Sequence, residues 1–467
     1  MSSLTLTRGR DTLHPRLAGF ARAMNTGARS MSMLVMGDST GAEADEWPTL
    51  LTTAIANRWP SWAVHLRSWD TTNLGWNRET VVGQGTAGAG YLDCNGSTAY
   101  GIGSVDNARI QITTDFTLQA KLYRSSSWTA QAGRQTVAAR IGGTGAWHLE
   151  MEANGKILVE WWTTGGAANQ NATSTVAVPF AVDTWGWIRA EIDLDNGAGG
   201  RSVSFFTSTD GTTWTQLGTT VTTAGTSSLN GTPGTGIALG TQGGQIFNGR
   251  IGEFDLFAGI TTGKQLRASW RPAIQYGAAE PEGWHLLPRQ SLDICGNSWV
   301  LFDNAFTDGR LIPGAPILTV LNGSSPGQVL SYFSEAGKFA QMTDTLPKVV
   351  HLSLGHNEGS GSDSSTWLAA YVAHVAALRA KIPDVAIVVH LQNPKYAPVA
   401  SQYRIAHHDR QERLSDAIER LQAVPVDAYG TFLARGGSSL VSAVDGTHPT
   451  TAGRTLWASL TRQQFGL

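Results

Sequence analysis

The chain has 467 residues, enough for two or three domains, and its 34 basic and 36 acidic residues give a formal net charge of -2. This balance, without a run of like charges, excludes the basic surface expected for binding to nucleic acid or to an anionic membrane. The sequence contains no stretch of eighteen apolar residues and no apolar run typical of a signal peptide near its start. It therefore predicts a protein that does not insert into a membrane and does not follow the general secretory route, which leaves the cytoplasm or a virion as its location.

The first region, residues 1–88, has the pattern that opens an α/β domain. Residues 31–36 form a short apolar run, and residues 43–59 carry apolar side chains at helical spacing. Residues 62–69 then resemble a strand. Strand, helix and strand in this order predict the opening of an α/β unit.

The middle region, residues 89–290, predicts an all-β domain. Several segments alternate apolar and polar side chains, and no long helical pattern separates them. Asn154-Gly155 lies between two alternating runs and predicts a tight hairpin, as Asp210-Gly211 does in the next pair. Short strands with regular turn signals indicate a β-sandwich.

The last region, residues 291–467, returns to alternating strands and helices. Apolar runs typical of buried parallel strands occupy residues 317–321, 349–354, 385–391 and 424–430. Helical patterns lie between them, at residues 326–342, 365–382 and 401–422. The simplest architecture is one α/β domain with a doubly wound, flavodoxin-like parallel sheet, interrupted by the sandwich. Three consecutive domains are disfavoured, because a lone strand–helix–strand of about 85 residues has little to pack against.

Two segments of the α/β regions carry residues suited to nucleophilic catalysis. Ser39, in Gly37-Asp38-Ser39, follows an apolar strand and precedes a helical pattern, so its hydroxyl is predicted at the carboxyl edge of the sheet near a helix N-terminus. Such a turn is also a common helix cap. Asp445 and His448 lie three residues apart on a loop, where the carboxylate can orient the imidazole. The alternative is a polar turn in which Pro449 begins a helix.

Two further segments follow predicted strands. Residues 322–327 contain glycines that can offer an unhindered backbone N–H, and Asn357, in Gly355-His356-Asn357-Glu358, can donate from its side-chain amide. All four segments lie at strand-to-loop junctions. They are therefore predicted to meet at one edge of one sheet.

These four segments, in this order, resemble the SGNH/GDSL serine hydrolases over residues 1–88 and 291–467. The resemblance implies an esterase with Ser39 as nucleophile, His448 as general base and Asp445 orienting His448. It implies an oxyanion hole made by the Ser39 N–H, the Gly327 N–H and the Asn357 side chain. This chemistry needs no metal and no cofactor.

The resemblance has two departures and one rival. Glu358 stands where the family more often has Asp, and Gly323 competes with Gly327 for the role of donor. Cys295-Gly296-Asn297-Ser298-Trp299 also resembles the nucleophile segment, which makes Ser298 a second candidate. The segment before Ser298 has only a weak strand pattern and no helical pattern follows it, so a β-hairpin that closes the sandwich is favoured at this position.

The middle region resembles concanavalin-like or laminin-G-like jelly rolls, which often bind glycans, on residues 91–122 and 203–218. The sequence leaves open whether it is a glycan-binding module or a spacer. Seven of its tryptophans are candidates for core packing or for sugar stacking: Trp128, Trp147, Trp161, Trp162, Trp185, Trp187 and Trp214. Three further side chains suggest either calcium or a strand-ending turn: Asp193, Asp195 and Asn196. A disulfide between Cys94 and Cys295 also stays open.

The predicted function is hydrolysis of an ester, best matched by an acylated carbohydrate, through an acyl-Ser39 intermediate. The alternative is a catalytically silent protein that binds a host surface. A sandwich embedded in a hydrolase resembles tail proteins of actinobacterial phages, so other tail proteins and a homo-oligomer are possible partners. Among the remaining histidines, His407 and His408 are expected to be solvated, and His351 and His390 to be packed within strands.

Overall fold

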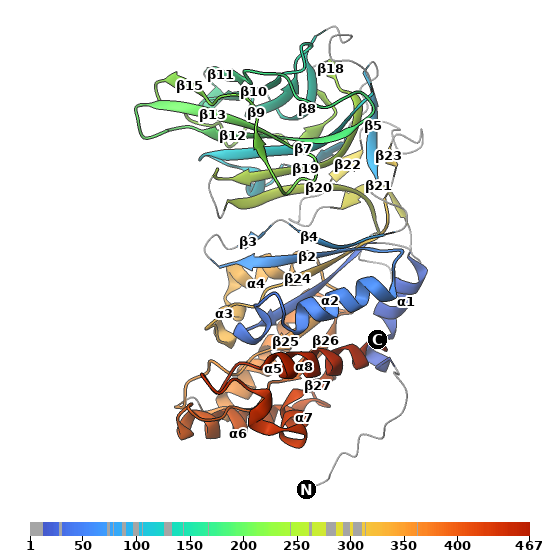
Figure 1. Ribbon diagram of the computed structural model, residues 1–467, viewed down its shortest axis with the longest axis vertical. Helices are drawn as coiled ribbons and strands as arrows, with labels where there is room; N and C mark the ends of the chain where they lie inside the picture. Colours follow the sequence, from blue (N-terminus) through green and yellow to red (C-terminus); the bar gives the residue numbers. More distant parts are fainter. Residues whose placement is uncertain are drawn as a thin grey trace. The chain divides into compact units, whose positions relative to one another are not determined.

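The computed structural model describes residues 13–467, except 28–29, 72–74, 78, 86–89, 97–101, 105, 126–132, 143, 167, 243, 261–263, 277–285, 293–298, 302–310, 313 and 362. The chain forms two compact units (Figure 1). The α/β unit comprises Met1–Thr86 and Pro316–Leu467, and the β unit comprises Ala87–Ala315. In the part of the chain that is described, no helix is long and apolar enough to cross a membrane.

The α/β unit is built on one sheet whose core strands are parallel. Its strand order is β27-β26-β25-β1-β24-β2-β3, and β4 also pairs with β2. The parallel strands are β1 (Met31–Gly37), β2 (Ala63–Asp70), β24 (Ile317–Asn322), β25 (Val349–Ser353), β26 (Ala386–Leu391) and β27 (Val424–Asp427). The antiparallel additions are β3 (Gly75–Trp76) and β4 (Thr80–Gln84). The five strands other than β2 follow the flavodoxin-like order, with β1 between β24 and β25.

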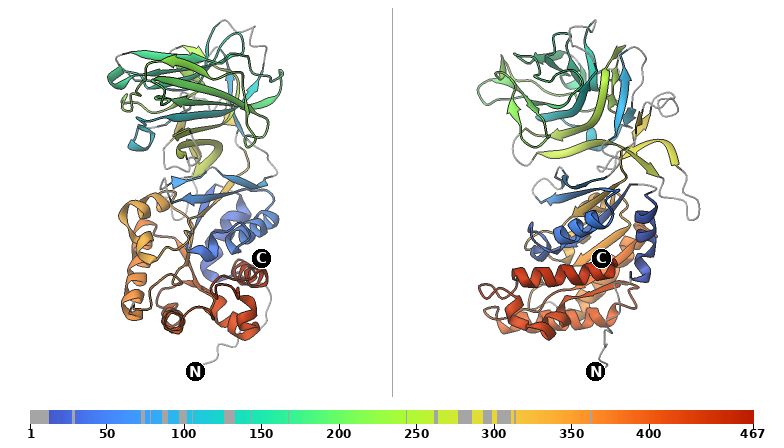
Figure 2. Two further views of the ribbon diagram at one scale, coloured as in Figure 1. Left: turned by 60° about the vertical axis from the view of Figure 1, so that its left-hand side comes forward. Right: turned by 45° about the vertical axis from the view of Figure 1, so that its right-hand side comes forward.

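Helices cover both faces of this sheet (Figure 2). One face packs against α1 (Ala18–Thr26), α2 (Trp47–Arg58), α7 (Ala428–Arg435) and α8 (Thr451–Gln464). The other packs against α3 (Leu330–Ser334), α4 (Ala336–Thr343), α5 (Ser364–Lys381) and α6 (Ser401–Ala417). Alternate residues of β1 enter the two cores, Met33 and Val35 on the first face and Leu34 and Met36 on the second. The prediction of a doubly wound parallel sheet is confirmed.

Three elements differ from the sequence prediction. Helix α1 was not predicted. The apolar run at 424–430 is a strand only to Asp427, because the Asp427 carboxylate accepts a hydrogen bond from the Gly430 N–H at 2.7 Å and caps α7. The helical pattern at 326–342 is broken into α3 and α4, because Glu335 has an extended backbone (φ -64°, ψ 125°).

The β unit consists of antiparallel sheets around one apolar core. One sheet contains β5 (Tyr91–Asn95), β7 (Phe116–Arg124), β12 (Trp185–Asp193), β13 (Gly200–Ser208), β14 (Thr215–Gln216), β15 (Val221–Ala224), β19 (Asn248–Ala258), β20 (Gln265–Tyr276) and β23 (Leu311–Ile312). The other contains β6 (Ile102–Ser104), β8 (Gln135–Arg140), β9 (Trp147–Met151), β10 (Ile157–Trp162), β11 (Asn169–Thr173), β16 (Ala238–Leu239), β21 (Leu286–Leu292) and β22 (Trp299–Leu301). A small hairpin, β17 (Thr241–Gln242) and β18 (Gln245–Ile246), packs against β8.

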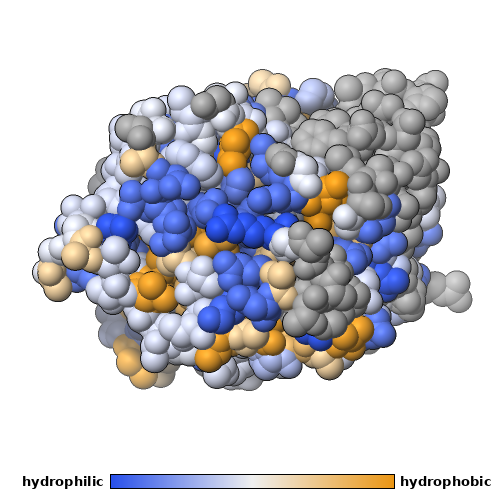
Figure 3. All heavy atoms as spheres, turned by 90° about the horizontal axis from the view of Figure 1, so that it is seen from above, coloured by the Kyte–Doolittle hydropathy of each residue, from blue (hydrophilic) through white to orange (hydrophobic). Residues whose placement is uncertain are grey.

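Local pairing in the β unit agrees with the turn signals. Gly155 has a φ of +79° in the turn that joins β9 to β10, and β13 pairs with β14 across Asp210-Gly211. Both hairpin predictions are confirmed. Among the coloured residues of the face shown in Figure 3, those of hydrophilic or intermediate hydropathy predominate, and the hydrophobic ones form separate small groups.

The β unit extends further along the chain than the pattern of apolar and polar residues in the sequence indicated. Strand β21 pairs with β20, β22 pairs with β6, and β23 pairs with β5, so strands beyond residue 290 belong to the β unit. These strands are two to seven residues long. Strands this short carry little periodic signal, which explains why the expected boundary at 290 and the unit boundary at 315 differ.

Candidate active site

Ser39 lies two residues beyond the carboxyl end of β1, at the centre of the parallel sheet. The Asp38 carboxylate accepts hydrogen bonds from the Thr40 N–H at 3.1 Å and the Thr40 hydroxyl at 2.8 Å, which fixes a short 3₁₀ turn over Ser39–Gly41. The α-helix itself begins only at Trp47, with Pro48 in its first turn. Ser39 precedes a helix, as predicted, but the backbone N–H groups beside it belong to the 3₁₀ turn and not to the helix N-terminus.

His448 joins Ser39 to Asp445. The Nε2 atom of His448 lies 2.7 Å from the Ser39 hydroxyl oxygen, and its Nδ1 atom lies 3.0 Å from a carboxylate oxygen of Asp445. These distances fit an Nδ1–H that donates to Asp445 and a serine hydroxyl that donates to Nε2. The side chains of His448 and Asp445 are 37% and 42% exposed, so the arrangement opens to solvent.

Hydrogen bonds hold Asp445 in its charged form. Burial raises the pKa of Asp445, but the backbone N–H groups of His448 and Thr447 and the His448 ring outweigh it, and the pKa is lowered overall. The two N–H groups donate to one carboxylate oxygen, at 2.9 Å and 2.7 Å, and the other oxygen faces the imidazole. An ionised Asp445 can therefore stabilise a positive charge on the His448 ring.

The loop that carries Asp445 and His448 is tied to the segment after β26. Asn393 donates to the Thr447 carbonyl at 2.8 Å, and the Tyr396 N–H donates to the Gly446 carbonyl at 2.8 Å. Gly446 has a φ of +65°, and a Cβ atom there would lie 2.2 Å from the Tyr396 carbonyl oxygen. Both the left-handed backbone and the close approach require glycine at this position.

Two glycines follow β24, and their N–H groups differ in availability. The Gly323 N–H donates to the Val35 carbonyl at 2.8 Å and so joins β24 to β1. The N–H of Gly327 has no hydrogen-bond partner among the described residues. Gly327 has a φ of +74°, and no atom lies within 4 Å of the position that a Cβ would occupy. Gly327 is therefore the glycine that can donate to a ligand.

Asn357 lies on the loop after β25, the strand on the other side of β1. Its amide nitrogen donates to the Gln328 carbonyl at 3.1 Å, which joins this loop to the glycine loop. One amide hydrogen of Asn357 is thereby used, and the second is available to a ligand. Because β24 and β25 both pair with β1, Gly327 and Asn357 flank the strand that leads to Ser39.

Glu358 joins the same two loops through its side chain, a role that sequence reasoning missed. Its carboxylate accepts from the Leu330 N–H at 3.0 Å, at the start of α3, and from the Trp367 indole N–H at 3.2 Å. Aspartate is one methylene shorter than glutamate. Glu358 therefore reaches further than an aspartate at this position would.

A buried polar network contacts the turn before Ser39, and no sequence pattern predicted it. The amide nitrogen of Gln392 donates to Asp38 at 2.8 Å, and the amide oxygen of Gln392 accepts from the His356 N–H at 2.8 Å. The backbone N–H of Gln392 donates to the Gln411 side chain at 2.9 Å. Burial raises the pKa of Asp38, while bonds from Gln392 and Thr40 oppose that shift. The network fixes the turn before Ser39 from below.

The other histidines correct one expectation. His351 and His390 are buried within strands, as predicted, and burial lowers the pKa of His351 to about 3. His408 has a half-exposed side chain, as predicted. His407 was expected to be solvated, but it is fully buried and its Nε2 lies 3.0 Å from the Asn393 carbonyl. It stacks on His356, whose pKa burial lowers to about 3.

Several predictions fall outside the described residues or outside the site. Ser298, Cys295 and Trp128 are not among the described residues, so the rival nucleophile and the disulfide to Cys94 stay untested. Strand β22 begins one residue after Ser298 and pairs with β6, in the β unit. The oxygens of Asp193, Asp195 and Asn196 accept backbone N–H bonds of their own turn.

The tryptophans of the β unit divide between the core and its edges. Trp147 and Trp161 are buried in the core, and Trp162 lies outside it, which agrees with opposite faces for Trp161 and Trp162.

The Lys121 ammonium lies 5.4 Å from the Trp185 ring and 5.9 Å from the Trp187 ring, so these two tryptophans share one face of the sheet. The Arg189 guanidinium lies 3.7 Å from the Trp214 ring.

Comparison with known proteins adds little to this geometry. No protein-family model and no curated protein matches the chain. A solved peptidoglycan O-acetylesterase is 13% identical over 97% of this chain and 95% of its own, with a TM-score of 0.37. A lipase/acylhydrolase from Enterococcus faecalis is 12% identical over 32% of this chain and 76% of its own (TM-score 0.27). A pentraxin from Limulus polyphemus is 9% identical over 37% and 78% (TM-score 0.26). Similarity at this level carries no argument about activity, which rests on the side chains.

Proposed function

We propose that the α/β unit is a serine esterase of the SGNH/GDSL type, with Ser39 as nucleophile, His448 as general base and Asp445 as the group that orients His448. The observation that carries the proposal is the continuous series from the Ser39 hydroxyl to His448 at 2.7 Å and from His448 to Asp445 at 3.0 Å. A hydroxyl within hydrogen-bond reach of an oriented imidazole is the arrangement that activates serine.

The reaction proceeds by acyl transfer in two steps. His448 takes the proton of Ser39 as the Ser39 oxygen attacks the ester carbonyl, and the protonated ring then gives that proton to the departing alcohol. Water repeats the attack on the acyl-serine, with His448 again as the base, and releases the carboxylic acid. Asp445 stays ionised and stabilises the imidazolium in both steps.

The proposed oxyanion hole comprises the N–H groups of Ser39 and Gly327 and the side chain of Asn357. The available Gly327 N–H, and the engagement of the Gly323 N–H by Val35, favour Gly327 as the second donor. Fixed donors of this kind stabilise the charge that develops on the carbonyl oxygen without reorganisation. The hydrolysis involves no metal or cofactor in this proposal.

We propose an acylated carbohydrate as the substrate. The half-exposed side chains of His448 and Asp445 leave room for a bulky, polar alcohol group. The loops that bear the site contain polar and small residues, including Ser325, Asn393 and Thr447. Two further parts of the proposal rest on the sequence resemblance alone. One is that the β unit is a concanavalin-like or laminin-G-like jelly roll, which binds glycan or acts as a spacer. The other is a place in a phage tail. Detection of the chain in purified virions by mass spectrometry tests that placement.

The alternative, a silent scaffold that binds a host surface, is disfavoured because Ser39, His448 and Asp445 keep hydrogen-bond contact. Hydrolysis of p-nitrophenyl acetate by the wild type, Ser39→Ala and Ser298→Ala separates the possibilities. We expect Ser39→Ala to lose roughly 10⁴-fold or more in kcat and Ser298→Ala to match the wild type. Loss of activity in Ser298→Ala alone would show that the nucleophile is misassigned. A wild type inert to this ester and to a fluorophosphonate probe would favour the silent scaffold.

A further inference from the structure

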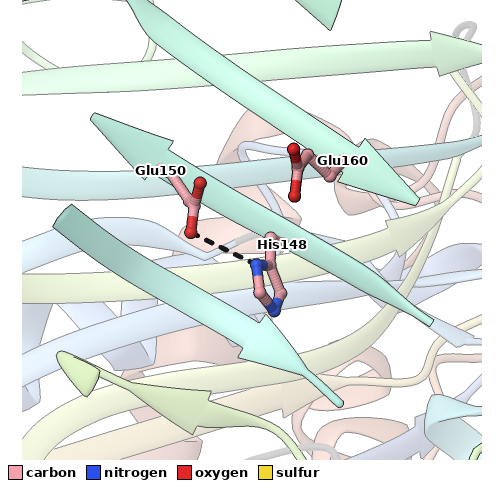
Figure 4. Close-up of side chains that lie close together, drawn as sticks. All are labelled: His148, Glu150 and Glu160. Carbon is pink, nitrogen blue, oxygen red and sulfur yellow. Dashed lines mark hydrogen bonds and ion pairs between the residues drawn. The ribbon is translucent and has the colours of Figure 1, made fainter. Parts of the chain in front are cut away.

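A second cluster of reactive side chains lies in the β unit, apart from the residues of the proposed esterase. His148 and Glu150 come from β9, and Glu160 comes from β10. One ligand atom from each lies within 4.8 Å of the others, and all three residues are buried. Figure 4 shows the two carboxylates and the imidazole grouped around a common space.

The strand register explains why these three side chains meet. His148 and Glu150 are two residues apart, so they project from the same face of β9. Glu160 is paired directly with His148 across the antiparallel ladder, which places it on that same face. The intervening residues, such as Leu149 and Val159, enter the apolar core on the opposite face.

The hydrogen bonds of the described residues leave this cluster incompletely satisfied. One oxygen of Glu150 accepts from the Thr136 hydroxyl at 3.3 Å and lies 3.2 Å from the His148 Nδ1. The other Glu150 oxygen is buried and has no hydrogen-bond partner, and neither has the His148 Nε2. The Glu150 side chain is 0% exposed. A buried carboxylate oxygen without a partner is costly and requires a compensating group.

Among the described residues, Arg134 is the cation that pairs with the cluster, and it compensates the two carboxylates only in part. Its NH1 atom lies 2.6 Å from Glu160 and 3.8 Å, an ion-pair distance, from the Glu150 oxygen that has no hydrogen bond. The Arg134 side chain is 42% exposed, so it approaches from the rim and can withdraw into solvent. Two buried carboxylates facing one guanidinium leave an excess negative charge.

We propose that His148, Glu150 and Glu160 form a binding site for a divalent transition metal, with Zn²⁺ as the best-matched ion. One imidazole and two carboxylates are ligands that zinc accepts, and three protein ligands leave the fourth tetrahedral position for water. Ligands about 2.1 Å from the ion lie roughly 3.4 Å from one another in a tetrahedron. The separation of 3.2 Å between the His148 Nδ1 and the Glu150 Oε1 is already close to that value. The ion replaces Arg134 as the counter-charge and links β9 to β10.

The test is isothermal titration of Zn²⁺ into metal-stripped full-length protein. We expect one saturable site per chain in the wild type. Glu160→Gln has nearly the same shape but lacks the charged ligand, and its affinity should fall by about 100-fold or more, because even outer-shell changes cost 10–100-fold. Glu150→Gln should behave alike. A wild type without a saturable site, or a Glu160→Gln protein that binds as the wild type does, overturns the proposal.

Arg134 supplies a variant whose expected effect, tighter zinc binding, cannot arise from misfolding. Arg134→Gln removes the competing cation and should tighten zinc binding several-fold, since the guanidinium no longer has to be displaced. Equal or weaker binding in Arg134→Gln overturns the displacement of Arg134 by the metal. His408→Gln is the matched control, because His408 and Glu412 form a solvent-exposed pair at 3.3 Å. This change should leave zinc binding at the His148, Glu150 and Glu160 site unaffected. Ester hydrolysis measured on the same proteins keeps this test separate from the proposed function.

Discussion

Glu46 offers a quantitative test of the α/β unit, because it is a fully buried carboxylic acid beside the start of α2. One of its oxygens accepts from the Glu43 N–H at 3.0 Å, and the other has no hydrogen-bond partner among the described residues. Burial raises the pKa of Glu46 from 4.5 to about 7, despite the hydrogen bond from Glu43 and the nearby charge of Arg454. The native state therefore favours the protonated acid.

The sign of the effect on stability follows from proton binding. Between pH 4.5 and about 7 the native state holds more of this proton than the unfolded chain does, so the free energy of unfolding falls as the pH rises. The stabilising contribution is complete below pH 4.5 and is lost above pH 7. At about 1.4 kcal/mol per pKa unit, the whole change is about 3 kcal/mol.

Hydrogen–deuterium exchange of peptides covering Trp47–Arg58 measures this effect in the α/β unit alone. Glu46→Gln keeps an acceptor for the Glu43 N–H but cannot ionise, so the variant serves as the reference at each pH. We expect the opening free energy of the wild type, relative to Glu46→Gln, to fall by about 3 kcal/mol between pH 4.5 and 8. The amide can add a constant cost, but not a pH-dependent one. A difference that stays constant within about 0.5 kcal/mol would refute the elevated pKa of Glu46.

Four further variants, at three positions, address the proposed active site. Asn357→Ala should lower kcat for p-nitrophenyl acetate by about 10²–10³-fold with little change in KM, and an unchanged kcat would remove Asn357 from the oxyanion hole. Glu358→Ala should lower kcat because the Leu330 N–H loses its acceptor, whereas Glu358→Gln keeps an acceptor and should remain close to the wild type. Equal kcat values for the two Glu358 variants would contradict this positioning role. Gly446→Ala should cost roughly 1–3 kcal/mol, seen as a lower Tm together with lost activity, because its Cβ would meet the Tyr396 carbonyl; an unaltered Tm would show that the loop adapts.

The parallel sheet was predictable because its strands form continuous apolar runs that are separated by clear helical patterns. Strands β24, β25 and β26 are buried throughout, or nearly so, which gives the continuous apolar runs seen in the sequence. The position of the site followed from topology, since residues after parallel strands meet at the carboxyl edge of the sheet. Ser39 and His448 are 409 positions apart, and their contact was predictable only through this rule and the family resemblance.

The supporting network was not predictable from residue polarity. Helix α6 buries His407, Arg410, Gln411 and Leu414, which recur at helical spacing, yet three of these four side chains are polar. An apolar stripe is the usual sign of a buried helix face, and α6 lacks one. Its polar face is buried because it is satisfied by the loops of the site: Arg410 donates to the carbonyls of Glu358 and Gly359, and His407 lies against the Asn393 carbonyl.

This polar packing explains how exposed site residues are held in place. Asp445 and His448 lie on a solvent-facing loop that is too exposed to be fixed by apolar burial. Their loop is held by Asn393 and Tyr396, and the backbone around Asn393 is in turn held by the buried ring of His407. A hydrogen bond to a buried partner is directional and costly to break. The contacts from the Asp445 loop to Asn393, and from Asn393 to His407, can therefore hold an exposed loop in place without covering it. The loop that carries Asp445 and His448 can therefore stay open to solvent, because polar contacts that reach α6, and not apolar burial, hold it.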